Sequence, residues 1–504
     1  MTGKPNIVFI LVDQQRADML GSYGDPVART PNTDRLAREG VQFDHCIAQA
    51  PLCMPSRSSM LCERYVRDHG VFQNYATVHP TVPTFLNSLC EAGYHTALNG
   101  KCHFYPYSNW DGRHMNTHRG TLRAYGFAET DEIAGKEGSF HIDSAYTDYL
   151  ARHGLLQEFR DYVKSRSKSL GYSLPGVRML EAWRADPLPL PVHGHIDAWL
   201  GGHAADWIRN HDGDAPFFLQ VGFGGPHDPW DAPTEALEAF GHPEIPMPGS
   251  IKPPEIPRSG PLEVFLRLMT EYSDTATMTP DAIAAMRRAY YANMMIIDDS
   301  IGRIIAALEE RGQLDNTWIV YASDHGEMMG EHRLVKKMVF YEPSVQVPLI
   351  IRPPGGLAGG MAGRRVDDLV ELNDISATFR DIAGAPMPTS QARSLLPALS
   401  GQSVAREVAI SEAYGVAMFR TATHKLVVYE DTVEPMQFFD LEADPHEDRN
   451  LVGTGADGGM IERMMDAYAR PFLSVRPVRP TRGTIERGRI SVNDFYLPGT
   501  VFPH

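Results

Sequence analysis

Asn6-Ile7-Val8-Phe9-Ile10-Leu11-Val12 is the stretch that indicates the fold class, and Asp13-Gln14 follows it directly. After Asn6 the run is entirely apolar and rich in β-branched residues. Such runs are typical of a strand covered on both faces, as in a parallel sheet. Because α/β proteins bind ligands at the carboxyl ends of such strands, Asp13 and Gln14 indicate a ligand site. A capped loop would account for the acid but less readily for an acid beside an amide.

Similar strands alternate with helical patterns along most of the chain. The alternation predicts an α/β fold, with a large mixed, mostly parallel sheet flanked by helices on both faces. In the longest predicted helix the apolar side chains recur every three or four residues. We expect strands at residues 41–48, 95–98, 217–221, 317–322 and 347–352, and helices at 84–92, 196–210, 280–311 and 374–383.

The chain divides into three expected segments. Residues 1–385 form the α/β domain that carries the site, with 104–190 as irregular insertions and loops over one end of the sheet. Residues 386–475 form a smaller α+β subdomain with an antiparallel sheet, followed by a tail at 476–504 that we expect to contact another subunit. The subdomain's short strands are predicted near 408–411, 418–420, 425–429 and 437–440, and its helix at 460–468.

Composition excludes several classes of protein. With 504 residues, 43% of them hydrophobic, the chain is an ordinary globular protein, and its net charge of −16 argues against broad nucleic-acid binding. A local anion pocket is compatible with that charge. The apolar run before Asp13 is too short for a signal sequence or a membrane span, so we expect no membrane association. Five cysteines without C-x-x-C spacing favour a reducing, cytoplasmic setting.

Cys53-Met54-Pro55-Ser56-Arg57 is the stretch with the clearest chemistry. Pro55 suits a first helical turn, so Cys53 is predicted at a helix N-terminus beside unpaired N–H groups. Arg57 adds a fixed cation one turn away. This setting suits a nucleophile that meets an anion, although a buried cysteine near a turn is the ordinary alternative.

Polar residues also follow the other predicted strands. Lys101 and His103 follow one strand, and a solvated loop is their ordinary interpretation. His227 lies between two prolines after the next, and Asp324-His325 after another. Convergence at one edge would join two carboxylates, an amide and an imidazole. The oxygen ligands suit a hard ion such as Ca²⁺, Mg²⁺ or Mn²⁺, and the imidazole favours Mn²⁺ or another transition metal. The nearby cations would suit transfer of a sulfuryl or phosphoryl group.

These motifs resemble the type I sulfatases of the alkaline phosphatase superfamily along nearly the full chain. Cys53-Met54-Pro55-Ser56-Arg57 matches the C-x-P-S-R signature of that family. One such motif is weak evidence, whereas a whole set in the family's order is strong. The other matches are Thr30-Pro31-Asn32, Gly100-Lys101-x-His103, Pro226-His227-x-Pro229, Ser323-Asp324-His325-Gly326, the segment 337–342, Asp444-Pro445-x-Glu447 and Asn450-Leu451.

The resemblance implies a metal-dependent sulfatase that hydrolyses sulfate monoesters of the aryl type. A separate formylglycine-generating enzyme would oxidise Cys53 to Cα-formylglycine, whose hydrate, a gem-diol, would be the nucleophile. One divalent ion, Ca²⁺ or Mn²⁺, would be bound by Asp13, Gln14, Asp324, His325 and the diol at position 53. The resemblance implies three catalytic roles. Arg57 and Lys101 would hold the diol and the ester oxygens, and Lys337 and His227 would act at the leaving oxygen. His103 would accept the proton of the second hydroxyl.

Two features resemble a neighbouring branch of the superfamily. The pair Gln14 and His325, where many sulfatases have Asp and Asn, is similar to phosphonate monoester hydrolases and choline-sulfatase-like enzymes. Those enzymes are intracellular and oligomeric, which implies a homodimer or homotetramer here. Asn74 matches a position at which they contact substrate. The Lys101-Cys102-His103 segment favours a sulfatase, with phosphonate monoester or phosphodiester hydrolysis as the alternative. The full set of charged groups disfavours a non-catalytic protein.

Overall fold

The computed structural model describes residues 3–74, 76–79, 81–106, 114–166, 183–256, 263, 266, 275–355, 362–387, 389–413 and 415–478. The structure does not describe residues 479–504, so the expected contact of the tail with another subunit lies outside the described residues. Within the described part of the chain, no helix combines the length and the apolar composition that crossing a bilayer requires.

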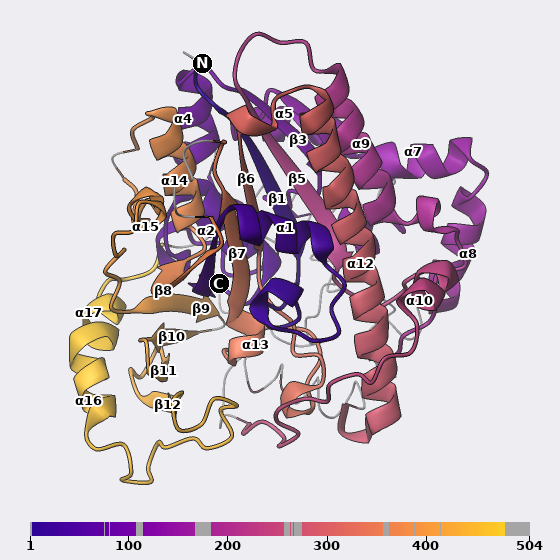
Figure 1. The fold of residues 1–504 in the computed structure, drawn as a ribbon. Helices are drawn as coiled ribbons and strands as arrows, with labels where there is room; N and C mark the ends of the chain where they lie inside the picture. The colour runs from indigo at the N-terminus through magenta and orange to yellow at the C-terminus, as the bar shows by residue number, and fades with distance from the viewer. Residues whose placement is uncertain are drawn as a thin grey trace, which may run out of the picture.

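An eight-stranded sheet forms the centre of the molecule, in the order β4-β3-β5-β1-β6-β7-β2-β8 (Figure 1). Every pairing in it is parallel except the two made by β7, so the predicted mixed, mostly parallel sheet is confirmed. The strands are β1 (Asn6–Asp13), β2 (Val41–Ile47), β3 (His95–Gly100), β4 (Glu129–Glu132), β5 (Phe217–Pro226), β6 (Thr317–Ser323), β7 (Gln346–Arg352) and β8 (Arg364–Glu371).

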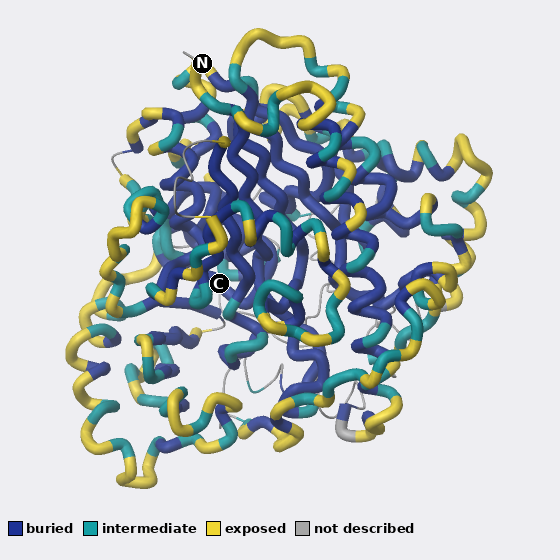
Figure 2. The backbone as a smooth tube through the Cα atoms, viewed as in Figure 1, coloured by how far each residue is buried: buried dark blue, intermediate teal, exposed yellow. Residues whose placement is uncertain are grey.

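Helices cover both faces of this sheet because β1 is apolar on both sides. Phe9 packs with α4 and α14 on one face, with its ring centroid 5.2 Å from that of Phe379. Ile10 packs with α1, α9 and α12 on the other face, and the strands between are buried (Figure 2). The helices are α1 (Pro31–Glu39), α2 (Cys53–Cys62), α4 (Phe85–Glu91), α9 (Ile196–Asn210), α12 (Pro280–Glu310) and α14 (Asp374–Ala383).

The insertion at 104–190 is more regular than predicted. Its described residues contain β4, which pairs with β3 at the edge of the sheet, and several short helices. The expectation of loops was wrong because β4 has the sequence Glu-Thr-Asp-Glu and presents no apolar run, a pattern that an edge strand tolerates. The helices are η2 (Met115–His118), α5 (Arg119–Ala124), α6 (Gly135–Gly138), α7 (Ala145–Arg152) and α8 (Leu156–Arg166).

A second, four-stranded antiparallel sheet follows near the carboxyl end, in the order β12-β11-β10-β9. It confirms the predicted smaller antiparallel unit, while the proposed boundary at 385/386 stays a prediction. Its elements are β9 (Ala409–Ala413), β10 (Val416–Arg420), β11 (His424–Tyr429), β12 (Pro435–Asp440), α16 (Met460–Met464), the π-helix η8 (Met465–Ala469) and α17 (Arg470–Leu473). Short helices elsewhere are α3 (Val66–His69), α10 (Thr234–Phe240), α13 (Glu342–Val345) and α15 (Leu396–Leu399).

Candidate active site

The strand order explains why the predicted residues meet. β3, β5, β1 and β6 are consecutive neighbours in the sheet and all run the same way, so their carboxyl ends lie along one edge. Asp13 is the last residue of β1, and the other three strands end directly before Lys101, His227 and Asp324. The sheet therefore brings four separate motifs to one place.

Cys53 enters the same place from α2. It is the first residue of that helix, as predicted, and its side chain is buried. Its Sγ lies 3.1 Å from Nε2 of His325 and 3.8 Å from Oδ1 of Asp13. Ligand-type atoms of Asp13, Cys53, Asp324 and His325 all lie within 4.8 Å of one another. Two carboxylates and an imidazole at this spacing fit a hard divalent ion, and Cys53 adjoins the ligands.

Arg57 neutralises the two carboxylates of this cluster. Its Nε donates to Oδ2 of Asp324 at 2.7 Å, and its Nη2 lies 3.4 Å from Oδ2 of Asp13. Its Nη1 donates to the backbone oxygens of Lys101 and Cys102 at 3.2 and 3.3 Å. The guanidinium is fully buried, so α2 and the β3 loop are held in a fixed relation to the cluster.

Lys101 adds a second cation. Its Nζ pairs with Oδ2 of Asp13. Burial works against the charged form of Asp13, yet the surrounding cations, led by Lys101, hold its pKa well below the usual range. Two glycines place this lysine, because a Cβ on Gly222 would collide with the Lys101 backbone and Gly100 has φ of 101°. The close approach fixes the strand exit that carries the ammonium.

His103 lies two residues further on, in a left-handed conformation with φ of 55°. Burial, together with the charges of Lys101 and Arg57, lowers the pKa of His103 well below its usual value. The imidazole is therefore neutral at physiological pH and able to accept a proton. A non-glycine residue with positive φ is a strained arrangement of the kind that gathers at functional sites.

Lys337 and His227 form a second pair beside the cluster. Nζ of Lys337 lies 2.7 Å from Nε2 of His227, and it also contacts Oε1 of Gln14. Nδ1 of His227 lies 2.6 Å from the backbone oxygen of Asp228, which can only accept, so Nδ1 carries the proton. Nε2 then accepts from the ammonium. Burial opposes the charge on Lys337, but Cys53 and Asp228 raise its pKa, so it stays protonated.

Three acids in the site were missed by sequence reasoning. Ligand-type atoms of Glu137, His227 and Asp228 form a second close group, and Nζ of Lys336 lies 3.1 Å from Asp228. The ammonium groups of Lys336 and Lys337 therefore supply the positive charge beside this second group. Asp228 and Glu327 adjoin predicted motifs, so their positions could have been suspected. Glu137 belongs to the insertion, where no motif signalled it.

Asn74 lies against the signature segment. Its Oδ1 accepts the backbone N–H of Met54 at 3.0 Å, next to Cys53. The amide is therefore placed beside the reactive segment, as expected of a residue near substrate. Its contact with substrate stays a prediction.

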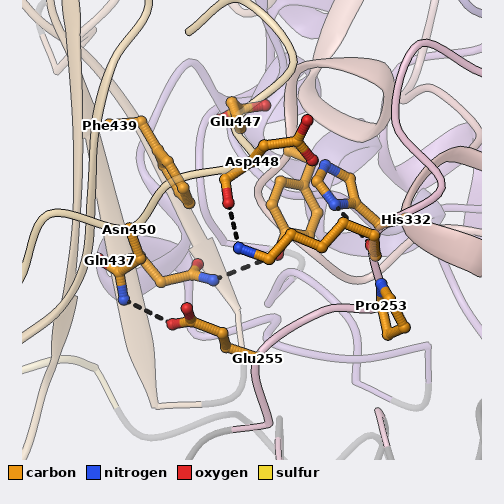
Figure 3. A pocket seen from close by; sticks show the side chains of 10 residues that line it. Pro253, Glu255, His332, Gln437, Phe439, Glu447, Asp448 and Asn450 are labelled. Carbon is orange, nitrogen blue, oxygen red and sulfur yellow. Dashed lines mark hydrogen bonds between the residues drawn. The ribbon is translucent and has the colours of Figure 1, made fainter.

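A small recess lies between the C-terminal sheet and the loop after β6, and no predicted site residue lines it (Figure 3). His332 in its wall stacks on Tyr341 with ring centroids 3.9 Å apart, and its Nε2 lies 3.0 Å from the backbone oxygen of His446. Buried Lys425 of β11 donates to the backbone oxygen of Phe340 at 2.7 Å. The C-terminal unit therefore supports the loop that carries Lys337.

Comparison with known proteins identifies the family. A profile described as Sulfatase matches residues 5–385. The chain belongs to the sulfatase family. A second profile, described as N-sulphoglucosamine sulphohydrolase, C-terminal, matches residues 330–469 of this sulfatase.

Relatives of the sulfatase cover nearly its whole length. An arylsulfatase of Clostridium perfringens is 30% identical over 473 residues, covering 90% of this chain and 91% of that protein. A choline-sulfatase of Rhizobium meliloti is 30% identical, covering 89% and 83%. The crystal structure of a phosphonate monoester hydrolase of Agrobacterium radiobacter has a TM-score of 0.74 at 24% identity, covering 94% of this chain and 95% of that one, and shows that the fold is shared.

Proposed function

We propose that this sulfatase hydrolyses sulfate monoesters of the aryl type through a formylglycine derived from Cys53. The observation that carries the proposal is the buried cluster of Cys53 with Asp13, Asp324 and His325, surrounded by fixed cations. Such a cluster suits an anionic, tetrahedral reacting group.

The proposed cofactors fit the residues around them. Asp13, Gln14, Asp324, His325 and the modified residue 53 would hold one Ca²⁺ or Mn²⁺ ion. When present, the ion supplies a Lewis acid and the hydrated formylglycine supplies the nucleophile. The oxygen-rich donor set favours these ions over softer metals.

The chain's own residues would orient the ester and move protons. Arg57 and Lys101, whose charges face the cluster, would hold residue 53 and the oxygens of the ester. Lys337 and His227 would stabilise the charge that develops on the leaving oxygen. His103, neutral because its pKa is lowered by burial and by Lys101, would accept a proton when sulfate is released.

The alternative is a phosphonate monoester hydrolase or phosphodiesterase that uses the same site, or an enzyme like the choline-sulfatases. Two observations favour this alternative. His325 stands in the cluster and Gln14 directly follows Asp13, where the resemblance implies that many sulfatases have other residues, and Asn74 bonds the signature segment. The similarity in fold to a phosphonate monoester hydrolase adds support.

Two measurements test the proposal. Mass spectrometry of the peptide that carries residue 53 should show the aldehyde after co-expression with a formylglycine-generating enzyme. An unmodified thiol with full activity would refute the mechanism. The ratio of kcat/KM for an aryl sulfate and for phenyl phosphonate esters then separates the two activities, and a large preference for the phosphonate would overturn our choice of substrate.

Three further expectations remain proposals. They are a formylglycine-generating enzyme as the maturing partner, a homodimer or homotetramer, and a cytoplasmic location. Unpaired cysteines are compatible with the reducing setting that we expect. Size-exclusion chromatography with light scattering measures the oligomeric state.

A further inference from the structure

The side chain of Gln14 is held by partners of opposite kinds. Its Nε2 donates to Oδ1 of Asp228 at 3.3 Å and to Oε2 of Glu327, while its Oε1 accepts from Nζ of Lys337. All four side chains are buried. An ionised carboxylate can only accept and an ammonium can only donate, so these partners decide which end of the amide faces which way.

Glu327 is occupied on both oxygens. Its Oε1 accepts the backbone N–H groups of Met329, at 3.1 Å, and of Lys336, while its Oε2 faces Gln14. A glutamine at position 327 would have to turn its NH₂ group either toward the amide nitrogen of Gln14 or toward two backbone N–H groups. Only a carboxylate satisfies donors on both sides.

We propose that Glu327 is a positioning residue that turns the oxygen of Gln14, and not its nitrogen, toward the metal cluster. The same carboxylate fixes the start of the loop that presents Lys337. The proposal rests on the proposed metal site, in which Gln14 is a ligand. Hydrogen bonds of this kind to metal ligands commonly change metal affinity by about 10–100-fold when removed.

The test is the affinity of the metal-free protein for Mn²⁺, measured by calorimetric titration under one buffer condition for all variants. E327Q is expected to weaken Mn²⁺ binding by about 10–100-fold. Its unfolding temperature in EDTA should fall by only a few degrees, because one buried hydrogen bond is lost while the shape of the side chain is kept.

A matched control separates orientation from general damage to the loop. Glu331 is a buried acid on the same loop that pairs with Arg16 and Arg287 at 3.3 and 2.9 Å and does not contact Gln14. E331Q should leave Mn²⁺ affinity within about threefold of the wild type. The exchange Q14E/E327Q places the donor and the acceptor the other way round, so it should recover most of the lost affinity.

Several results would overturn the proposal. They are wild-type affinity in E327Q, an equal loss in E331Q, or no recovery in the exchange variant. If E327Q does not fold, Q14E alone provides the test, because its new carboxylate would face Glu327 and Asp228 and should not bind Mn²⁺ more tightly. If E327Q loses Mn²⁺ affinity, E331Q keeps it and the exchange variant recovers it, but the wild type hydrolyses neither ester, the proposed function is refuted and the role of Glu327 stands.

Discussion

Replacing Lys337 by methionine should remove the positive charge beside the leaving oxygen while keeping the approximate shape of the side chain. Nζ of Lys337 lies 2.7 Å from Nε2 of His227 and contacts Oε1 of Gln14, which puts it between His227 and a proposed metal ligand. Lys336 is its neighbour in sequence and pairs with Asp228 at 3.1 Å. K336M therefore removes the same charge from the same loop, at a residue that pairs with Asp228.

The magnitude follows from burial. Lys337 is 6% exposed, so its charge acts in a site of low dielectric. Losing one oriented donor in such a site costs about 2.7–4 kcal/mol of transition-state stabilisation, or about 10²–10³ in kcat. The loss should grow as the leaving phenol becomes more basic, because more charge then develops on the leaving oxygen. K336M should lose about tenfold or less in kcat, since Lys336 pairs with Asp228, although breaking this buried pair should also lower the stability of the protein.

The assay compares kcat/KM for 4-nitrophenyl sulfate and phenyl sulfate at saturating Mn²⁺, with rates divided by the aldehyde content at residue 53. Saturating metal removes any effect that K337M has through Gln14. Lysine ordinarily titrates above about pH 9, and Asp228 raises the pKa of Lys337 even when Cys53 has been converted, so the ratio of wild type to variant should be constant between about pH 6 and pH 9. Equal losses in both variants, or a loss independent of the leaving phenol, would contradict a role at the leaving oxygen.

Three further outcomes are expected. Lys425 is fully buried and pairs with Glu342 and Glu447 at 2.7 and 2.6 Å, so K425M should lower the unfolding free energy by about 3–5 kcal/mol in urea titrations; a loss under 1 kcal/mol would contradict this. Burial raises the pKa of Asp197 from 3.8 to about 6, so the stability that this group contributes is complete below about pH 4 and is lost as pH rises through 6. The unfolding free energy of the wild type should therefore fall by about 3 kcal/mol over this range, and D197N should remove that fall. An unchanged pH profile of stability in D197N would contradict this. Chelation should abolish activity, and Mn²⁺ or Ca²⁺ should restore it and raise the unfolding temperature; full activity after exhaustive dialysis against EDTA would contradict a metal site.

The arrangement of strand ends was predictable because the relevant signals are local. A buried run such as Ile7 to Val12 predicts a strand on its own, and the residue after it is read directly from the chain. Parallel strands share an edge, so Asp13, Lys101, His227 and Asp324 could be placed together without knowledge of the strand order. The helix start at Cys53 was also local, since Pro55 fixes it.

The remaining site residues depend on contacts that no local pattern encodes. Glu137 reaches the site because α6 lies across the end of β5, far from it in sequence. Glu327 acts through one contact with Gln14, which lies 313 positions away. β4 was missed because its residues are polar and its place at the sheet edge is decided by pairing with β3. Periodicity reports burial, and these features are set by tertiary pairing.

The charge of the cluster bears on which esters the proposed site could accept. In the proposed ligand set Asp13 and Asp324 carry the negative charge, whereas Gln14 and His325 would be neutral ligands, so a divalent ion would be balanced before the cations are counted. Arg57, Lys101 and Lys337 then leave the site positive, as any singly charged tetrahedral group requires. Sulfate monoesters, phosphonate monoesters and phosphodiesters all meet that condition. Discrimination among them would therefore belong to contacts with the alcohol, and we expect the insertion that carries Glu137 next to His227 and Asp228 to contribute to them.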